Sequence, residues 1–279
     1  MKLEAVSERK GTDQNTTGDR QLLAVSFGTS YCDTRTRTIG AIERAMEQAM
    51  PEYVLHRAFT SQMIIDRVKR KENLVIDNMK EALDRAADQG IKTLIIQPTH
   101  LMKGFEYRDL AEEASGYRDL FEHMAVGEPL LTSEEDFETV VRAITGDTKE
   151  YDDGETAICF MGHGTEAASN QVYERLQKLL HKRGFKHYYV GTVEASPSIK
   201  DVLRAVKKGS YRKAVLQPLM IVAGDHANND MAGDEEGSWK HEFEKEGYEV
   251  KCVLKGLGEM ELIRQLFVRH AKAAGENFE

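Results

Sequence analysis

Two segments in different halves of the chain open with the same residues, and this internal repeat constrains the fold more than any other feature. Gln97–Asp109 reads QPTHLMKGFEYRD, and Gln217–Asp230 reads QPLMIVAGDHANND. Both begin as an apolar strand that leads to a glycine, but Glu106 stands in the first segment where His226 stands in the second. The sequence therefore predicts two copies of one structural unit that differ where functional groups would lie.

The repeat extends along both halves in the same order. SFGTS at 26–30 matches GHGTE at 162–166, and VGEPLL at 126–131 matches GLGEMEL at 256–262. In each half apolar runs alternate with helical stretches, which is typical of a parallel sheet covered by helices. We expect an α/β fold of two similar doubly wound domains, with the active site in the cleft between them at the carboxyl ends of the strands.

The pattern also predicts individual elements and domain limits. The expected strands are residues 22–27, 53–59, 93–101, 124–131, 156–162, 187–194, 214–222 and 248–256. The expected helices are residues 34–50, 79–88, 106–120, 134–144, 168–183, 199–208, 239–246 and 259–273. A polar linker at 146–155 separates the halves. We therefore expect a disordered polar tail at 1–20, a first domain at 21–147 and a second at 148–279, which would carry the metal ligands.

Composition narrows the class of protein. The net charge is −9 and the pI about 5.6, which argues against nucleic acid or an anionic membrane as a main partner. No apolar run approaches the roughly 20 residues of a membrane span, and the polar N-terminus lacks the apolar core of a signal peptide. Three scattered cysteines form no disulfide framework. We expect a cytoplasmic protein, and a homo-oligomer stays open.

The two halves differ most at the ends of three strands. The aligned pairs are Phe27 with His163, Phe59 with Glu194, and Glu106 with His226. The second half thus places two imidazoles and one carboxylate where the first half has two phenylalanines and a glutamate. Two histidines and a carboxylate are a ligand set expected for a borderline divalent cation such as Co²⁺, Ni²⁺, Fe²⁺ or Zn²⁺.

Each of these residues also has a purely structural interpretation. His163 lies between two glycines, which form strand-to-helix turns without any ligand. Glu194 would cap a helix that begins at Ser196, and His226 would be an ordinary loop histidine. The sequence contains no phosphate-binding G-x-x-x-x-G-K-[ST] loop, no G-x-S-x-G elbow and no H-E-x-x-H motif.

Several segments closely resemble the anaerobic, class II cobalt chelatases. They are LLAVSFGTSYCDT, RAFTSQMII, FMGHGTEAASN, TVEASPS and LMIVAGDHANNDMAGDEEGSWK, and the resemblance runs from about Gln21 to the C-terminus. It implies a two-domain α/β chelatase, a lyase related in fold to ferrochelatase. It also implies insertion of Co²⁺, as substrate metal, into the tetrapyrrole sirohydrochlorin in cobalamin biosynthesis, a branch of porphyrin biosynthesis, without an organic cofactor. The family's metal ligands fall on His163, Glu194 and His226.

The implied reaction assigns further roles. A metal enters a tetrapyrrole only as the two pyrrole protons leave, and imidazole and carboxylate are suitable acceptors. We expect His163 and Glu106 to act as catalytic proton acceptors. Since sirohydrochlorin is polyanionic, basic side chains must offset the acidic protein around it. The expected substrate contacts are Ser26, Phe27, Gly28, Thr29, Arg35, Arg57 and Lys103.

Two alternatives remain at this point. The chain is a nickel or iron chelatase acting on a related tetrapyrrole, or it is a non-catalytic haem- or metal-binding protein that uses the same histidines as ligands.

Overall fold

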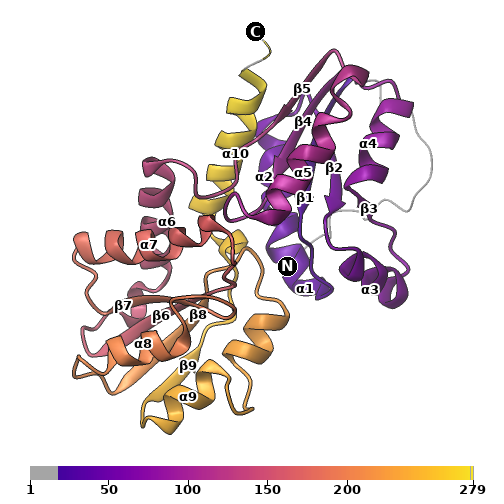
Figure 1. The fold of residues 1–279 in the computed structure, drawn as a ribbon. Coiled ribbons are helices and arrows are strands. Elements are labelled where there is room, and N and C mark those ends of the chain that lie inside the picture. The colour runs from indigo at the N-terminus through magenta and orange to yellow at the C-terminus, as the bar shows by residue number, and fades with distance from the viewer. Residues whose placement is uncertain (1–17, 277, 279) are drawn as a thin grey trace, which may run out of the picture.

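The computed structural model describes residues 18–276 and 278. Residues 1–17 of the predicted tail at 1–20 lie outside the described residues. The first strand begins at Arg20, the last residue of the predicted tail. Two separate parallel sheets occupy the two halves of the chain (Figure 1), so the predicted α/β class with two similar parallel-sheet units is confirmed.

The first sheet has five parallel strands in the order β3-β2-β1-β4-β5. These are β1 (Arg20–Ser26), β2 (Val54–Phe59), β3 (Asp77–Asn78), β4 (Thr93–Pro98) and β5 (His123–Val126). The connecting helices are α1 (Cys32–Arg37), α2 (Ile39–Ala49), α3 (Gln62–Glu72), α4 (Met79–Asp88), α5 (Phe105–Ser115) and the 3₁₀ turn η1 (Arg118–Leu120). Alternate residues of β1 pack on opposite faces, Leu22 with α2 and Leu23 with α4, as a doubly wound sheet requires.

The second sheet has four parallel strands in the order β7-β6-β8-β9. These are β6 (Thr156–Gly162), β7 (Tyr188–Thr192), β8 (Lys213–Pro218) and β9 (Glu249–Cys252). Its helices are α7 (Gln171–Lys182), α8 (Ile199–Val206), the π-helical turn η4 (Ala227–Met231) and α9 (Trp239–Lys245), with 3₁₀ turns η2 (Lys149–Tyr151), η3 (Ala168–Asn170) and η5 (Leu257–Glu259). The order β7-β6-β8-β9 reproduces β2-β1-β4-β5, so the internal repeat is structural.

Backbone hydrogen bonds just beyond the strands fix how the two halves correspond. The Ser61 N–H donates to the Phe27 carbonyl (3.3 Å), and the Glu194 N–H donates to the His163 carbonyl (2.9 Å). Phe27 and His163 are therefore equivalent, as predicted. Glu194 corresponds to Ser61, so the predicted pairing of Glu194 with Phe59 is wrong by two residues.

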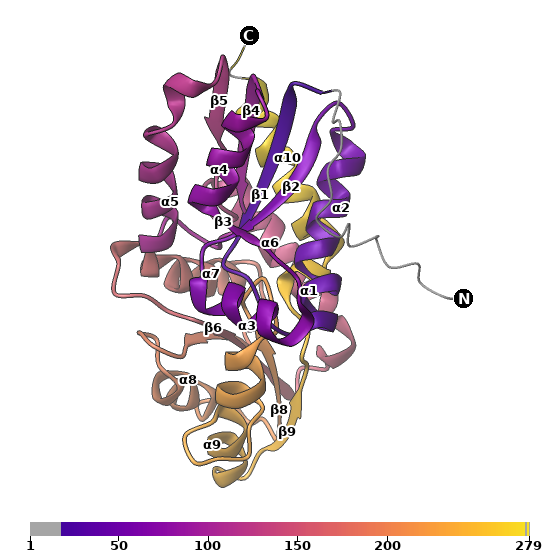
Figure 2. The same ribbon diagram turned by 90° about the vertical axis from the view of Figure 1, so that its right-hand side faces the viewer.

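The last helix of each half packs across the repeat. These helices are α6 (Glu134–Asp147) and α10 (Glu261–Glu276). Although α10 ends the second half, it lies along the first sheet beside α2 (Figures 1 and 2), and α6 packs against α7 as well as α10. One buried cluster consequently contains Leu22 of β1, Phe160 of β6 and Leu266 of α10. A boundary near residue 147 separates the two sheets but not their cores.

Two local expectations fail for identifiable reasons. The helix predicted at 34–50 is divided at Thr38, whose hydroxyl and N–H both donate to the Thr34 carbonyl. Helix α3 was not expected, although Ile64, Ile65 and Val68 form its buried face and the Ser61 side chain caps it. The missed α3 matters for the site, because it carries two charged residues that fix positions discussed below.

Candidate metal centre

His163 follows directly after the last residue of β6, and its two flanking glycines allow close packing. A Cβ on Gly162 would lie 2.1 Å from the buried Tyr173 ring. Gly164 has φ +91°, and a Cβ there would lie 2.8 Å from the Ala195 nitrogen. A larger residue at Gly164 would therefore push the His163 turn away from the loop that follows β7, and one at Gly162 would push it away from Tyr173 of α7.

Glu194 lies in that neighbouring loop, beside His163. Besides the backbone bond to the His163 carbonyl, its Oε2 is 3.7 Å from His163 Nδ1. Both side chains are about half-exposed. The alternative role for Glu194, capping a helix that begins at Ser196, does not fit. Helix α8 begins only at Ile199, and Ser198 forms its capping box.

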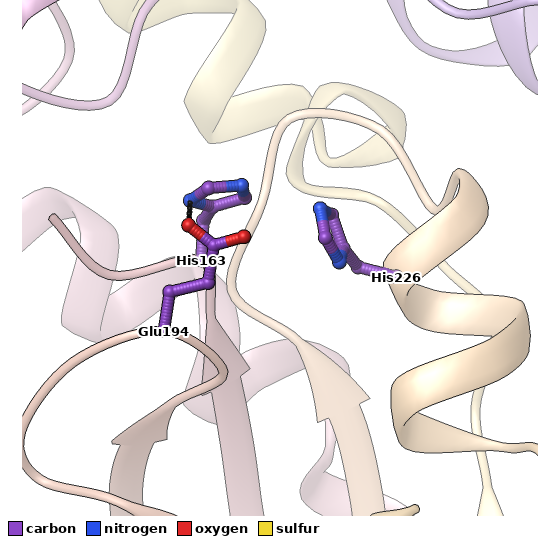
Figure 3. Close-up of side chains that lie close together, drawn as sticks. All are labelled: His163, Glu194 and His226. Atoms are coloured by element: carbon purple, nitrogen blue, oxygen red, sulfur yellow. Dashed lines mark ion pairs between the residues drawn. The ribbon is translucent and has the colours of Figure 1, made fainter.

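His226 faces these two residues from the other side (Figure 3). It is the residue that precedes the π-helical turn η4, and its ring centroid is 4.6 Å from that of His163, with the planes at 86°. His226 Nδ1 lies 2.8 Å from Asp230 Oδ2, four residues later. The three predicted ligands thus converge from the carboxyl ends of three adjacent strands, β7, β6 and β8.

The spacing of the three side chains suits a single cation. One ligand atom from each of His163, Glu194 and His226 lies within 4.8 Å of the others. Within residues 18–276 and 278, these three form the group of histidine, cysteine or acidic side chains that could hold a metal ion. At metal–ligand bonds of about 2.1 Å, two ligands of a tetrahedral ion lie roughly 3.4 Å apart. Side-chain movements of about 1 Å would therefore close the set around an ion.

The hydrogen bonds of the two rings define which nitrogen faces a metal. His163 Nδ1 is 2.9 Å from the Gly164 carbonyl oxygen, which only accepts hydrogen bonds, so Nδ1 must donate. The Asp230 carboxylate likewise accepts from His226 Nδ1. In both neutral rings Nε2 is then the free ligand atom. The sequence interpretation missed Asp230, although its spacing of four residues from His226 is the helical signal for such a contact.

Glu106 approaches from the first half of the molecule. It is the second residue of α5, and no side chain forms a capping hydrogen bond at the start of this helix. Partial burial raises the pKa of Glu106, and a charged His163 acts in the opposite direction. Its Oε2 lies 3.6 Å from Nε2 of the buried His100, whose pKa falls to about 4 because of burial. His100 is thus a neutral imidazole behind a half-exposed carboxylate.

The residues predicted to bind substrate after β1 divide into buried and exposed ones. Ser26 and Thr29 are buried, and the Ser26 hydroxyl lies 2.7 Å from that of Thr99. Gly28 has φ +101° and packs against the Phe59 ring. Phe27 is 45% exposed. Phe27 is therefore the member of this group whose side chain remains open to a ligand.

The three predicted basic contacts are all paired with carboxylates. Arg35 is buried and bound to Glu72 of α3 and to the Thr29 carbonyl, so its guanidinium is closed to solvent in this structure. Arg57 lies within β2, and its Nε donates to Glu43 (2.7 Å). Lys103 Nζ lies 2.6 Å from Glu128 but is half-exposed at the start of α5.

No helix within residues 18–276 is both long enough and apolar enough to cross a membrane.

Among solved structures, SirB from Bacillus subtilis with Fe3+ is similar, with a TM-score of 0.65 and 13% identity over 92% of this chain and 96% of that one. This likeness concerns the fold alone. The fold that the two chains share places the His–Glu–His cluster at the edge of the second parallel sheet.

The particular family follows from sequence comparison. The model of the cobalt chelatase (CbiK) family matches residues 20–276. The sirohydrochlorin cobaltochelatase of Salmonella typhimurium is 37% identical over 255 residues, which cover 91% of this chain and 96% of that protein. The sirohydrochlorin cobaltochelatase CbiKC of Nitratidesulfovibrio vulgaris is 29% identical over 91% of this chain and 89% of its own length. This chain belongs to the cobalt chelatase (CbiK) family.

Proposed function

We propose that this enzyme inserts Co²⁺ into sirohydrochlorin, the reaction named for its relatives in Salmonella typhimurium and Nitratidesulfovibrio vulgaris. The observation that carries the proposal is the convergence of His163, Glu194 and His226 at one edge of the second sheet. The reaction exchanges one cation for two pyrrole protons and transfers no electrons, so its chemistry requires no organic cofactor.

The triad holds the incoming cation. Nε2 of His163 and of His226 are the imidazole ligands, because each Nδ1 is engaged by an acceptor. Glu194 adds one negative charge, which offsets part of the charge of the cation. Two neutral ligands and one carboxylate bind a divalent ion without cancelling its charge, and the half-exposed side chains leave room for a ring to take over coordination.

The pyrrole protons leave towards residues on both sides of the ring. Glu106 belongs to the first half and lies within electrostatic reach of His163. Its carboxylate, with a pKa raised by burial, is a better proton acceptor than a fully solvated glutamate. The two protons go to Glu106 and to His163 once the cation has moved to the ring. The exposed Phe27 contacts the macrocycle, and Lys103 pairs with its carboxylates.

The test is a chelation assay with purified protein, Co²⁺ and sirohydrochlorin, followed by the absorbance change on metal insertion. The wild type should accelerate insertion, and His163→Ala and His226→Ala should each abolish the acceleration while the protein stays folded by circular dichroism. Near-normal turnover by a folded His226→Ala variant would refute the assignment of the site. Parallel assays with Ni²⁺ and Fe²⁺ decide whether cobalt is the preferred substrate.

A further inference from the structure

The segment that leads to His226 leaves the second sheet and packs on the first half of the molecule. After β8 ends at Pro218, Val222 joins a cluster built from Ile39 and Phe59 of the first half. Gly224 lies against Thr29, since a Cβ on this glycine would be 3.6 Å from the Thr29 hydroxyl oxygen. His226 is therefore carried by a loop that packs on both halves, because Leu257 and Gly258 of the second half also donate backbone hydrogen bonds to it.

Asp225, immediately before His226, is bound by two donors from that first half. The Tyr31 hydroxyl donates to Oδ1 (2.8 Å), and Arg67 Nη1 donates to Oδ2 (3.3 Å). Tyr31 precedes α1, and Arg67 lies in α3. Each carboxylate oxygen thus has its own donor from a different element, which fixes the direction as well as the position of the Asp225 side chain.

The other two ligands do not depend on the first half in this way. The backbone bond between Glu194 and His163 holds their two loops together within the second half. The two bonds of Asp225 span 194 and 158 residues of sequence, respectively, and join the halves directly beside the third ligand. A change in the separation of the halves would therefore act on Asp225, the residue beside His226, but not directly on the loops of the other two ligands.

On the basis of the proposed function, we infer that Asp225 is a positioning residue. Held by Tyr31 and Arg67, it places His226 for metal binding and makes the cobalt affinity depend on the arrangement of the two halves. The competing view is that these contacts are ordinary surface interactions. All three side chains are exposed to a substantial degree, and exposed pairs usually contribute little. The two views differ in what they predict for metal binding.

The experiment titrates Co²⁺ alone into the full-length protein and follows the visible absorption of the bound ion, without sirohydrochlorin. Tyr31→Phe and Arg67→Gln should each raise the Kd by about three- to tenfold, which corresponds to about 0.6–1.4 kcal/mol. They should also shift the absorption bands, because the position of one imidazole changes. In an Asp225→Asn background the effect of Tyr31→Phe should shrink, since the pair is already broken.

Arg183→Gln is the matched control, because it removes another exposed arginine–carboxylate pair, with Glu138, that contacts none of the triad. Its Kd and spectrum should equal those of the wild type. If Tyr31→Phe and Arg67→Gln behave like this control while His226→Ala weakens binding, the inference is wrong and the proposed function stands. If His226→Ala also binds cobalt normally, the proposed site itself is wrong, and the inference fails with it.

Discussion

Replacing Asp230 with asparagine should weaken cobalt binding about tenfold while leaving the fold intact. The carboxylate accepts the hydrogen bond of His226 Nδ1 at 2.8 Å within the η4 turn. An asparagine of nearly the same shape can still offer an oxygen, but it lacks the negative charge that makes the imidazole a stronger ligand. The change therefore tests electrostatic support of His226 rather than its position.

The structure sets the size of this effect. Loss of a carboxylate partner of a ligating histidine typically costs 10- to 100-fold in metal affinity. The side chains of His226 and Asp230 are 36% and 46% exposed, so water screens their interaction and places the loss near the lower limit. A tenfold rise in Kd corresponds to about 1.4 kcal/mol.

The assay is the same Co²⁺ titration, with thermal unfolding as a check on stability. Asp234→Asn is the control, because Asp234 lies nearby in the chain but is 88% exposed and pairs with Lys240. The control should bind cobalt as the wild type does. A Kd for Asp230→Asn within twofold of the wild type, measured beside a His226→Ala variant that loses binding, would show that the Asp230 charge does not support the ligand.

Three further predictions concern the remaining parts of the site. Glu106→Gln should lower turnover by about 10²-fold or more and leave the cobalt Kd unchanged. Glu194→Gln should mainly raise the cobalt Kd. Equal losses of cobalt affinity in both variants would mean that the two halves share the metal. Burial raises the pKa of Glu106, so as the pH falls Glu106 becomes protonated at a higher pH than a solvated glutamate does. The wild-type rate should therefore decline in acid, and the pH–rate profile of Glu106→Gln should lack that decline. An unchanged profile would exclude Glu106 as the base. Gly162→Ala should lower the free energy of unfolding by about 1–3 kcal/mol through collision with the Tyr173 ring, measured by urea denaturation, and unaltered stability would contradict the packing described.

The internal repeat allowed the sheets and the triad to be predicted because it marks the ends of parallel strands. Residues at those ends share one edge of a sheet, so His163 and His226 were expected to lie near each other, and the structure places β6 and β8 side by side. Glu194 was predicted from an alignment of the two halves that was wrong by two residues at this position. It lies two residues beyond the position matched with Phe59, and it still reaches His163 because the strand pairing continues past β7.

The failures arise where a side chain finds a partner that is distant in sequence. Arg35 was predicted to offset the negative charge of the substrate, but its partner Glu72 lies in α3, a helix that the sequence interpretation missed. Arg67 lies in the same helix, so its bond to Asp225 was equally hidden. Local periodicity describes how α3 begins and which face it buries, but it contains no information on which charged group of another element a given side chain will reach.

Under the proposed function, the two halves divide the chemistry of insertion rather than duplicate it. The second half supplies His163, Glu194 and His226, while the equivalent position to His226 in the first half is Glu106, a carboxylate whose pKa is raised. Insertion exchanges one cation for two protons, and the second half would present the cation while Glu106 of the first half takes up one of the protons. Asp225 then links the two operations, because its bonds to the first half make the position of one metal ligand depend on the half that carries the base. Under the proposed function, a ring that separates the halves as it binds would draw His226 back and so favour transfer of the cation to the ring.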